Sequence, residues 1–74
     1  MTNNELKDAM LAGIPVVHKT VRYGEVPYKR ISGIIYRPGT NGKIRISAEL
    51  LDYNNNSVTI VRGEEVFSDD DTSY

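Results

Sequence analysis

Few side chains in this sequence have the types and spacing that catalysis requires. His18 is the only histidine, and no second titratable group lies at a spacing that promises contact with it, although general acid–base catalysis needs such a partner. The sequence has no cysteine, which excludes thiol nucleophiles, disulfides and thiolate zinc sites. It also has no P-loop, no GxGxxG motif and no nucleophile elbow. We therefore predict that the protein is not an enzyme and needs no cofactor.

One acidic run near the C-terminus is the only pattern that could suggest metal binding. Asp69, Asp70 and Asp71 are consecutive, so their carboxylates point in different directions and lack the spaced ligands of a calcium loop. We interpret them as part of a flexible acidic tail over residues 68–74, and we predict no metal site.

Charge is distributed unevenly along the chain, although the net charge is only −1. Residues 19–45 hold seven cations and one anion, whereas residues 46–74 hold one cation and seven anions. Such asymmetry is typical of proteins that bind nucleic acid or acidic partners. Basic strands that pair with acidic strands inside one fold would produce the same asymmetry, so both explanations stay open.

The basic residues gather around one predicted hairpin. The segment IIYRPGTNGKIRIS, residues 34–47, has two β-branched arms joined by a turn whose glycines supply positive φ. The cations on and beside this hairpin, with two isoleucines as apolar anchors, form the surface that we predict to bind a partner. Its members are Lys29, Arg30, Ile31, Ile35, Arg37, Lys43 and Arg45.

A short helix is predicted at the N-terminus, over about residues 3–12. Thr2 and Glu5 have the spacing of a capping box. Leu6, Ala9 and Met10 recur on one helical face. A helix this short must pack against other elements to be stable.

Strands are predicted for most of the remaining chain, over residues 16–20, 28–37, 43–52 and 57–62, with a last short strand at Val66. Residues 21–27 are predicted to form a loop or a bent edge, because Pro27 cannot donate to a ladder.

The register of the central strands follows from the turns that we assign. We place Arg37 opposite Lys43, and Asp52 opposite Asn56. This register predicts one continuous apolar face across three strands: Ile34, Tyr36, Ile44, Ile46, Ala48, Leu50, Val58 and Ile60. The opposite face mixes aliphatic residues, Ile31 and Val61 among them, with charges. We expect the N-terminal helix to cover that opposite face, or failing that another molecule.

The predicted fold is mostly β, in one domain over residues 1–67. A small, strongly bent barrel of about five strands, preceded by the helix, is the arrangement that removes exposed strand edges.

Residues 58–66, VTIVRGEEV, resemble the second signature of Sm-like RNA-binding proteins, in which a strand ends in Arg-Gly. The layout of a short helix and five strands is also similar to the SH3-like barrel of that family. The resemblance implies that Arg62 and Gly63 line a nucleotide pocket and that subunits join edge to edge in rings. Together with the basic strip, it implies a nucleic-acid site formed by Arg62, Gly63, Tyr28, Lys43 and Arg45.

Residues 28–60 are also similar to small uncharacterised proteins of bacterial phages and mobile elements. That resemblance implies a non-enzymatic accessory factor that binds a host protein, such as a defence nuclease, and modulates or inhibits it as anti-CRISPR proteins do. The alternative is an Sm-like or SH3-like module that binds RNA or single-stranded nucleic acid.

The expected location is the cytoplasm, and the bacterial cytoplasm if the protein is phage-derived. The N-terminal segment is too polar for a signal peptide, and no apolar run approaches the roughly 18 residues of a membrane helix. We expect a protein partner first, nucleic acid second and no membrane, and we leave homo-oligomerisation open.

Overall fold

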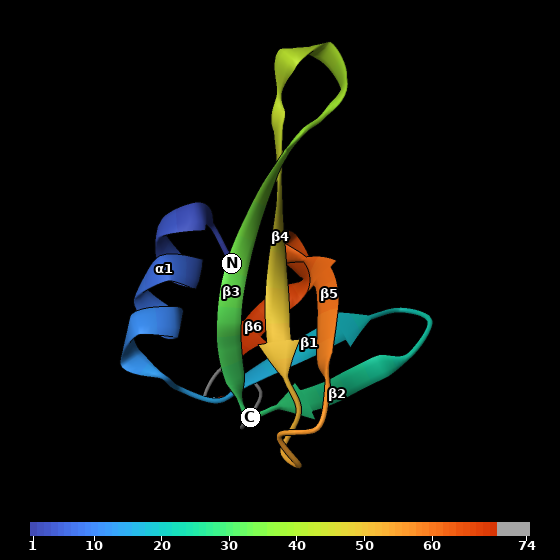
Figure 1. The fold of residues 1–74 in the computed structure, drawn as a ribbon. Helices are drawn as coiled ribbons and strands as arrows, with labels where there is room; N and C mark the ends of the chain where they lie inside the picture. The colour runs from blue at the N-terminus through green and yellow to red at the C-terminus, as the bar shows by residue number, and fades with distance from the viewer. Residues whose placement is uncertain (70–74) are drawn as a thin grey trace.

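The computed structural model describes residues 1–69. Their single α-helix, α1 (Asn3–Ala12), precedes six strands and two single-turn 3-10 helices. The elements that follow α1 are β1 (Val16–Thr20), β2 (Gly24–Tyr28), β3 (Arg30–Pro38), η1 (Thr40–Gly42), β4 (Ile44–Leu51), β5 (Val58–Arg62), η2 (Gly63–Glu65) and β6 (Val66–Ser68) (Figure 1). Within the described residues, no helix has the length and apolar character needed to cross a membrane.

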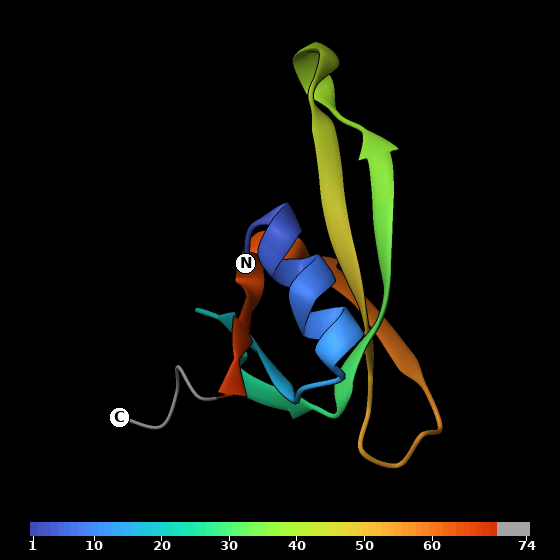
Figure 2. The same ribbon diagram turned by 90° about the vertical axis from the view of Figure 1, so that its left-hand side faces the viewer.

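The strands form two antiparallel sheets of three strands each. Sheet A has the order β2-β1-β6, and sheet B has the order β3-β4-β5. Figure 2 shows α1 between β6 and the long β3–β4 hairpin. The mostly β architecture with one N-terminal helix is therefore confirmed. The sheets do not close on each other, so the predicted SH3-like barrel of about five strands is not confirmed.

The N-terminal helix forms where its capping signals predict it. The Glu5 amide donates to the Thr2 hydroxyl, and the Thr2 amide donates to the Glu5 carboxylate, which completes the capping box. The helix ends at Gly13, which has the left-handed φ of 67°. Leu6 and Ala9 are buried on its inner side.

The core lies between α1, sheet A and one face of sheet B, which we call the inner face. Its buried residues are Leu6, Ala9, Val16, Ile31, Ala48, Leu50, Val61 and Val66. The helix therefore covers the same face of sheet B that holds Ala48 and Leu50. Our expectation that the helix covers the opposite, outer face is wrong.

The β3–β4 hairpin pairs two residues away from the predicted register. Arg37 lies opposite Arg45 rather than Lys43, because the turn is wider than we assumed. The Gly39 amide donates to the Lys43 carbonyl at 2.6 Å, and Asn41 and Gly42 take positive φ values of 59° and 74°. A shift of two residues preserves the side-chain alternation, so the predicted faces of β3 and β4 near the turn are retained.

The β4–β5 register is displaced by one residue, and this reverses the faces of β5. Ala48 lies opposite Val61, and Leu51 lies opposite Val58. Val61 is therefore buried, whereas Val58 and Ile60 are 47% and 54% exposed on the outer face. The prediction that Val58 and Ile60 enter the core is wrong.

The turn between β4 and β5 explains this displacement. The Asp52 carboxylate accepts hydrogen bonds from the amides of Asn54 and Asn56 and from the Ser57 hydroxyl. The Asp52 amide donates to the Ser57 carbonyl, so Asp52 is paired with Ser57 rather than with Asn56. The loop is thus one residue longer than the predicted one.

An irregularity in β3 moves Ile31 into the core. The register shifts between Ile31 and Gly33, which places Ile31 opposite Leu50. Ile31 is 1% exposed, so the prediction that it anchors a partner on the surface is wrong.

The remaining strand predictions hold in part. Residues 24–28 form the edge strand β2, in which Pro27 lies opposite Val17, as expected of a proline at an edge. Tyr28 belongs to this strand and not to β3. Ser68 belongs to β6, so the predicted tail over 68–74 begins too early. Residues 70–74 lie outside the described residues.

Asp52 gives a testable consequence of the β4–β5 turn. The hydrogen bond from the Ser57 hydroxyl holds the pKa of Asp52 below its ordinary value of 3.8. Partial desolvation opposes this effect, and the hydrogen bonds from the amides of Asn56 and Asn54 add to it. A depressed folded-state pKa contributes stability above the unfolded pKa, and that stability is lost as the pH falls through the folded value. We expect Ser57→Ala to raise the pKa of Asp52 toward 3.8 in an NMR titration of its carboxyl carbon.

The matched control is Ser47→Ala, because Ser47 lies in β4 away from this turn. An Asp52 pKa that stays the same in Ser57→Ala would contradict the assignment of the turn.

Candidate functional site

The β3–β4 hairpin projects beyond the rest of the molecule (Figure 2). In this part, which we call the projecting hairpin (residues 36–46), no element covers the inner face completely. Tyr36 and Ile44 are 46% and 67% exposed, although both were predicted to be core residues. The Tyr36 hydroxyl donates to Asn3 Oδ1 at the start of α1. The core prediction fails here because the strands extend past the helix that packs on them.

Arginines gather on the outer face of this hairpin. Arg37 lies directly opposite Arg45. In the neighbouring row, Ile35 lies opposite Ser47, and Ser47 lies opposite Arg62 on β5. Opposite residues of paired strands project from the same face, so three arginines from three strands share one surface.

The charges on this surface are poorly compensated. Arg62 forms an exposed ion pair with Glu64 at 3.8 Å. Within residues 1–69, neither Arg37 nor Arg45 has an acidic side chain within ion-pair distance. Like charges directly opposite in a sheet are destabilising, so the folded chain accepts an unfavourable pair at this position.

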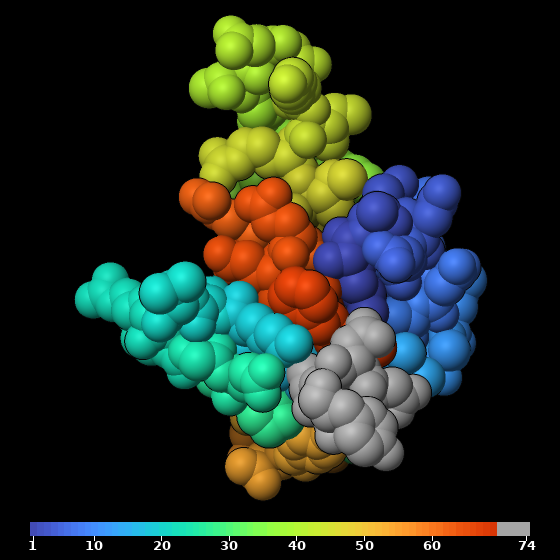
Figure 3. All heavy atoms as spheres, turned by 180° about the vertical axis from the view of Figure 1, so that it is seen from behind, coloured from blue at the N-terminus to red at the C-terminus, as the bar shows by residue number. Residues whose placement is uncertain are grey.

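An open cavity of about 570 Å³ lies beside the hairpin and reaches from Gly39 and Thr40 at its turn to Ser47 nearer its base. It is bordered by the upper half of β4, the end of β5 with η2, and the start of the chain, three segments that meet below the hairpin tip (Figure 3). Lys43, Arg45 and Arg62 line it, and Glu64 is the only acidic residue among the described residues that do so.

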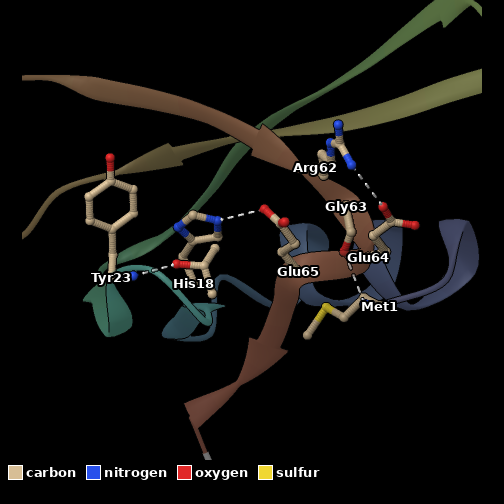
Figure 4. Close-up of polar contacts among 8 residues, drawn as sticks. Met1, His18, Tyr23, Arg62, Gly63, Glu64 and Glu65 are labelled. Carbon is tan, nitrogen blue, oxygen red and sulfur yellow. Dashed lines mark hydrogen bonds and ion pairs between the residues drawn. The ribbon is translucent and has the colours of Figure 1, made fainter.

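Two residues that line this cavity, Met1 and Gly63, are joined by a hydrogen bond (Figure 4). The Met1 amine donates to the carbonyl oxygens of Gly63 and Val66 at 3.0 and 2.8 Å. Gly63 is buried, and a Cβ at this position would lie 2.8 Å from Leu6 Cδ1 and 3.3 Å from the Ile46 carbonyl oxygen. Gly63 therefore acts as a spacer that lets β5 end against α1.

The predicted partner-binding residues do not form one surface. Arg37, Lys43 and Arg45 lie together at the projecting end, and Ile35 adjoins them on the outer face. Strand β3 rises about 3.3 Å per residue, so Arg30 lies about 23 Å from Arg37. Lys29 is also at this far end, where its Nζ donates to Asn55 Oδ1 at 3.0 Å. The prediction that Lys29 and Arg30 share the hairpin surface is therefore wrong.

The residues of the alternative nucleic-acid site are brought together, with one exception. Arg62, Gly63, Lys43 and Arg45 all line the cavity. Tyr28 lies on β2, where it packs against the hydrophobic core. The cavity has no aromatic residue among its described lining residues.

One polar pair was missed by sequence reasoning. His18 Nε2 lies 3.0 Å from Glu65 Oε1, and both are partly buried (Figure 4). The pairing of β1 with β6 places His18 opposite Val66, which brings Glu65 beside it. No local spacing signals a contact between residues so far apart in sequence. The pair links β1 to η2, and no cluster of metal-binding side chains occurs in the described part of the chain.

No family model, no curated protein and no solved structure matches this chain. The resemblances to Sm-like proteins and to small phage proteins therefore remain predictions.

Gly63 provides a test of the cavity wall. Because Leu6 is fully buried, it has no free space into which to retreat from an added methyl group. We expect Gly63→Ala to lower the free energy of unfolding by about 1–3 kcal/mol, as is typical of overpacked sites. Urea denaturation measures the change. Glu64→Ala, at the exposed neighbouring position, is the control and is expected to have little effect, and equal stability of the two variants would contradict the packing described.

Proposed function

We propose that this protein is a small non-enzymatic binding protein that captures an acidic protein partner at the projecting hairpin. The observation that carries the proposal is the pair of directly opposed arginines, Arg37 and Arg45, neither of which has an acidic side chain within ion-pair distance among residues 1–69. An acidic partner would relieve this repulsion and would be guided to the surface by the same charges.

The neighbouring residues suit a protein partner. Ile35 is half-buried next to Arg37, and the exposed Ile60 lies in the row below Arg62 on the same outer face. Protein interfaces commonly combine apolar contacts with arginine and with a polar rim. We propose that the partner is a host protein that the bound chain modulates or inhibits, in line with the resemblance of residues 28–60 to small phage and mobile-element proteins.

Charge reversal at the two ends of the β3–β4 hairpin tests this proposal. We expect the combined change of Arg37, Lys43 and Arg45 to Glu to reduce partner capture at least tenfold. The measurement is a pull-down from a bacterial lysate, in which the captured protein is identified by mass spectrometry and then purified for titration. The matched control reverses Lys29 and Arg30, at the far end, and should retain capture. Equal capture by both variants would contradict the proposed surface.

A second candidate function is binding of single-stranded nucleic acid. The observation in its favour is the convergence of Arg62, Lys43 and Arg45 on one cavity. This second candidate would make the protein an SH3-like or Sm-like module, as the resemblance of residues 58–66 implies. It ranks second because single-strand binders combine cations with aromatic rings on which bases stack, and Tyr28 lies elsewhere.

Salt titration separates the two candidates. For binding through phosphates, the logarithm of the binding constant falls linearly with the logarithm of the salt concentration. We expect no measurable binding of fluorescent single-stranded RNA or DNA by fluorescence anisotropy, even at low salt. Salt-dependent binding that is lost in Arg62→Ala would favour the second candidate over the first.

A further inference from the structure

The upper half of β4 has a strand on only one of its sides. Strand β3 pairs with β4 along its whole length, from Ile44 to Leu51. Strand β5 pairs with β4 only as far as Ser47, which lies opposite Arg62. Among the described residues, no strand pairs with Ile44, Arg45 or Ile46 on the β5 side, and the cavity lies along this free edge.

Backbone groups of two residues face this edge. The Gly39–Lys43 and Asp52–Ser57 hydrogen bonds fix the alternation: odd-numbered residues of β4 near the turn bond to β3, and even-numbered residues bond toward β5. The amide and carbonyl of Ile44 and the amide of Ile46 therefore point toward the cavity, whereas the Ile46 carbonyl lies against Gly63. An edge of this kind can be extended by a strand from another molecule.

Three opposed residue pairs are enough to hold a strand at a sheet edge in this fold. Strand β6 is held on β1 by three opposed pairs, from Val16–Ser68 to His18–Val66. The extended residues Lys43, Ile44 and Arg45 offer the same number of positions along sheet B, beyond the end of β5.

The side chains along the edge specify the chemistry of an added strand. Arg45 lies on the outer face, and Arg62 continues that face on the adjacent strand. Ile44, on the inner face, is 67% exposed. Since opposite residues share a face, an acidic residue opposite Arg45 and an apolar residue opposite Ile44 would be complementary.

A second copy of this chain fits the edge poorly. The described strand segments with a free side are β2, β3, β5, β6 and the upper half of β4 itself, and they carry the single acid Glu25 against Arg30, Arg37, Arg45 and Arg62. Each of the two longer candidates, β3 and β5, would bring a further arginine to an edge already lined by Lys43, Arg45 and Arg62.

We propose that the free edge of β4 takes up an extended, alternating acidic and apolar segment of a partner protein as an added antiparallel strand. This inference rests on the proposed function and gives it a binding mode. The main-chain hydrogen bonds to Ile44 supply the pairing, and Arg45, Lys43 and Arg62 select the acidic side chains.

The test uses a fluorescent peptide of alternating valine and glutamate, acetylated and amidated at its ends, and measures its binding to the full chain by anisotropy at low salt. In the antiparallel register, the valine that lies opposite Ile44 exchanges two hydrogen bonds with it, and the neighbouring glutamates lie opposite Lys43 and Arg45. N-methylation of the valine amides should weaken binding at least tenfold. N-methylation of the glutamate amides, whose N–H groups point away from β4, should change it less than twofold.

A change in the protein provides the complementary test. Ile44→Pro removes the N–H that faces the cavity and leaves the β3 ladder intact, because Ile44 lies opposite Pro38 in a pair without mutual hydrogen bonds. It should weaken peptide binding at least tenfold, whereas the control Ile44→Val should bind within twofold of the parent. Circular dichroism and thermal unfolding establish that both variants are folded.

Several outcomes would overturn the inference. Absence of peptide binding at low salt, or equal effects of the two methylation patterns, excludes antiparallel strand addition. Displacement of the peptide by a single-stranded oligonucleotide that binds more tightly would assign the edge to nucleic acid. Self-association in light scattering that Ile44→Pro abolishes would assign it to a second copy. If the charge-reversed hairpin loses partner capture while Ile44→Pro retains capture of that same partner, the proposed function stands and strand addition alone fails.

Discussion

The pairing of β5 with β4 determines which side chains form the core and which form the surface. The Asp52 carboxylate accepts hydrogen bonds from two loop amides and from the Ser57 hydroxyl, and these bonds fix the length of the connecting loop. Side chains of a strand alternate between faces, so a loop shorter by one residue would reverse all of β5. With the observed loop, Val61 meets Ala48 inside, and Val58 and Ile60 remain outside.

The position at which β5 ends determines which part of β4 is left without a partner strand. Gly63 fits between Leu6 and the Ile46 carbonyl, and the chain then turns through η2 and returns to sheet A as β6. The strand therefore stops at Arg62, halfway along β4. The packing requirement at one glycine thus leaves the upper half of β4 with an unpaired edge, beside the residues that carry the positive charge.

Sequence reasoning succeeded where the determining interactions are local. The capping box and the apolar spacing located α1, and the alternation of β3 and β4 placed Arg37 and Arg45 on one face. It failed where one residue or a distant partner decides the result, as in the β5 register, the burial of Ile31 and the His18–Glu65 contact. Likewise, the pairing of β6 with β1 and the open arrangement of the two sheets have no local signal, so a closed barrel was predicted.

The like-charged pair at the projecting hairpin has different consequences for folding and for binding. Arg37 opposite Arg45 opposes closure of the hairpin, so the turn bonds at Gly39 and Lys43 and the packing further down the strands must outweigh this repulsion. Charges at an exposed site mainly raise the rate of association and exclude partners of the same sign. In the proposed binding mode, discrimination among acidic partners would depend on short-range features, namely the unpaired β4 backbone and the exposed Ile44 beside it. Charge and edge would then contribute separately, the first to the rate of encounter and the second to the selection of the partner.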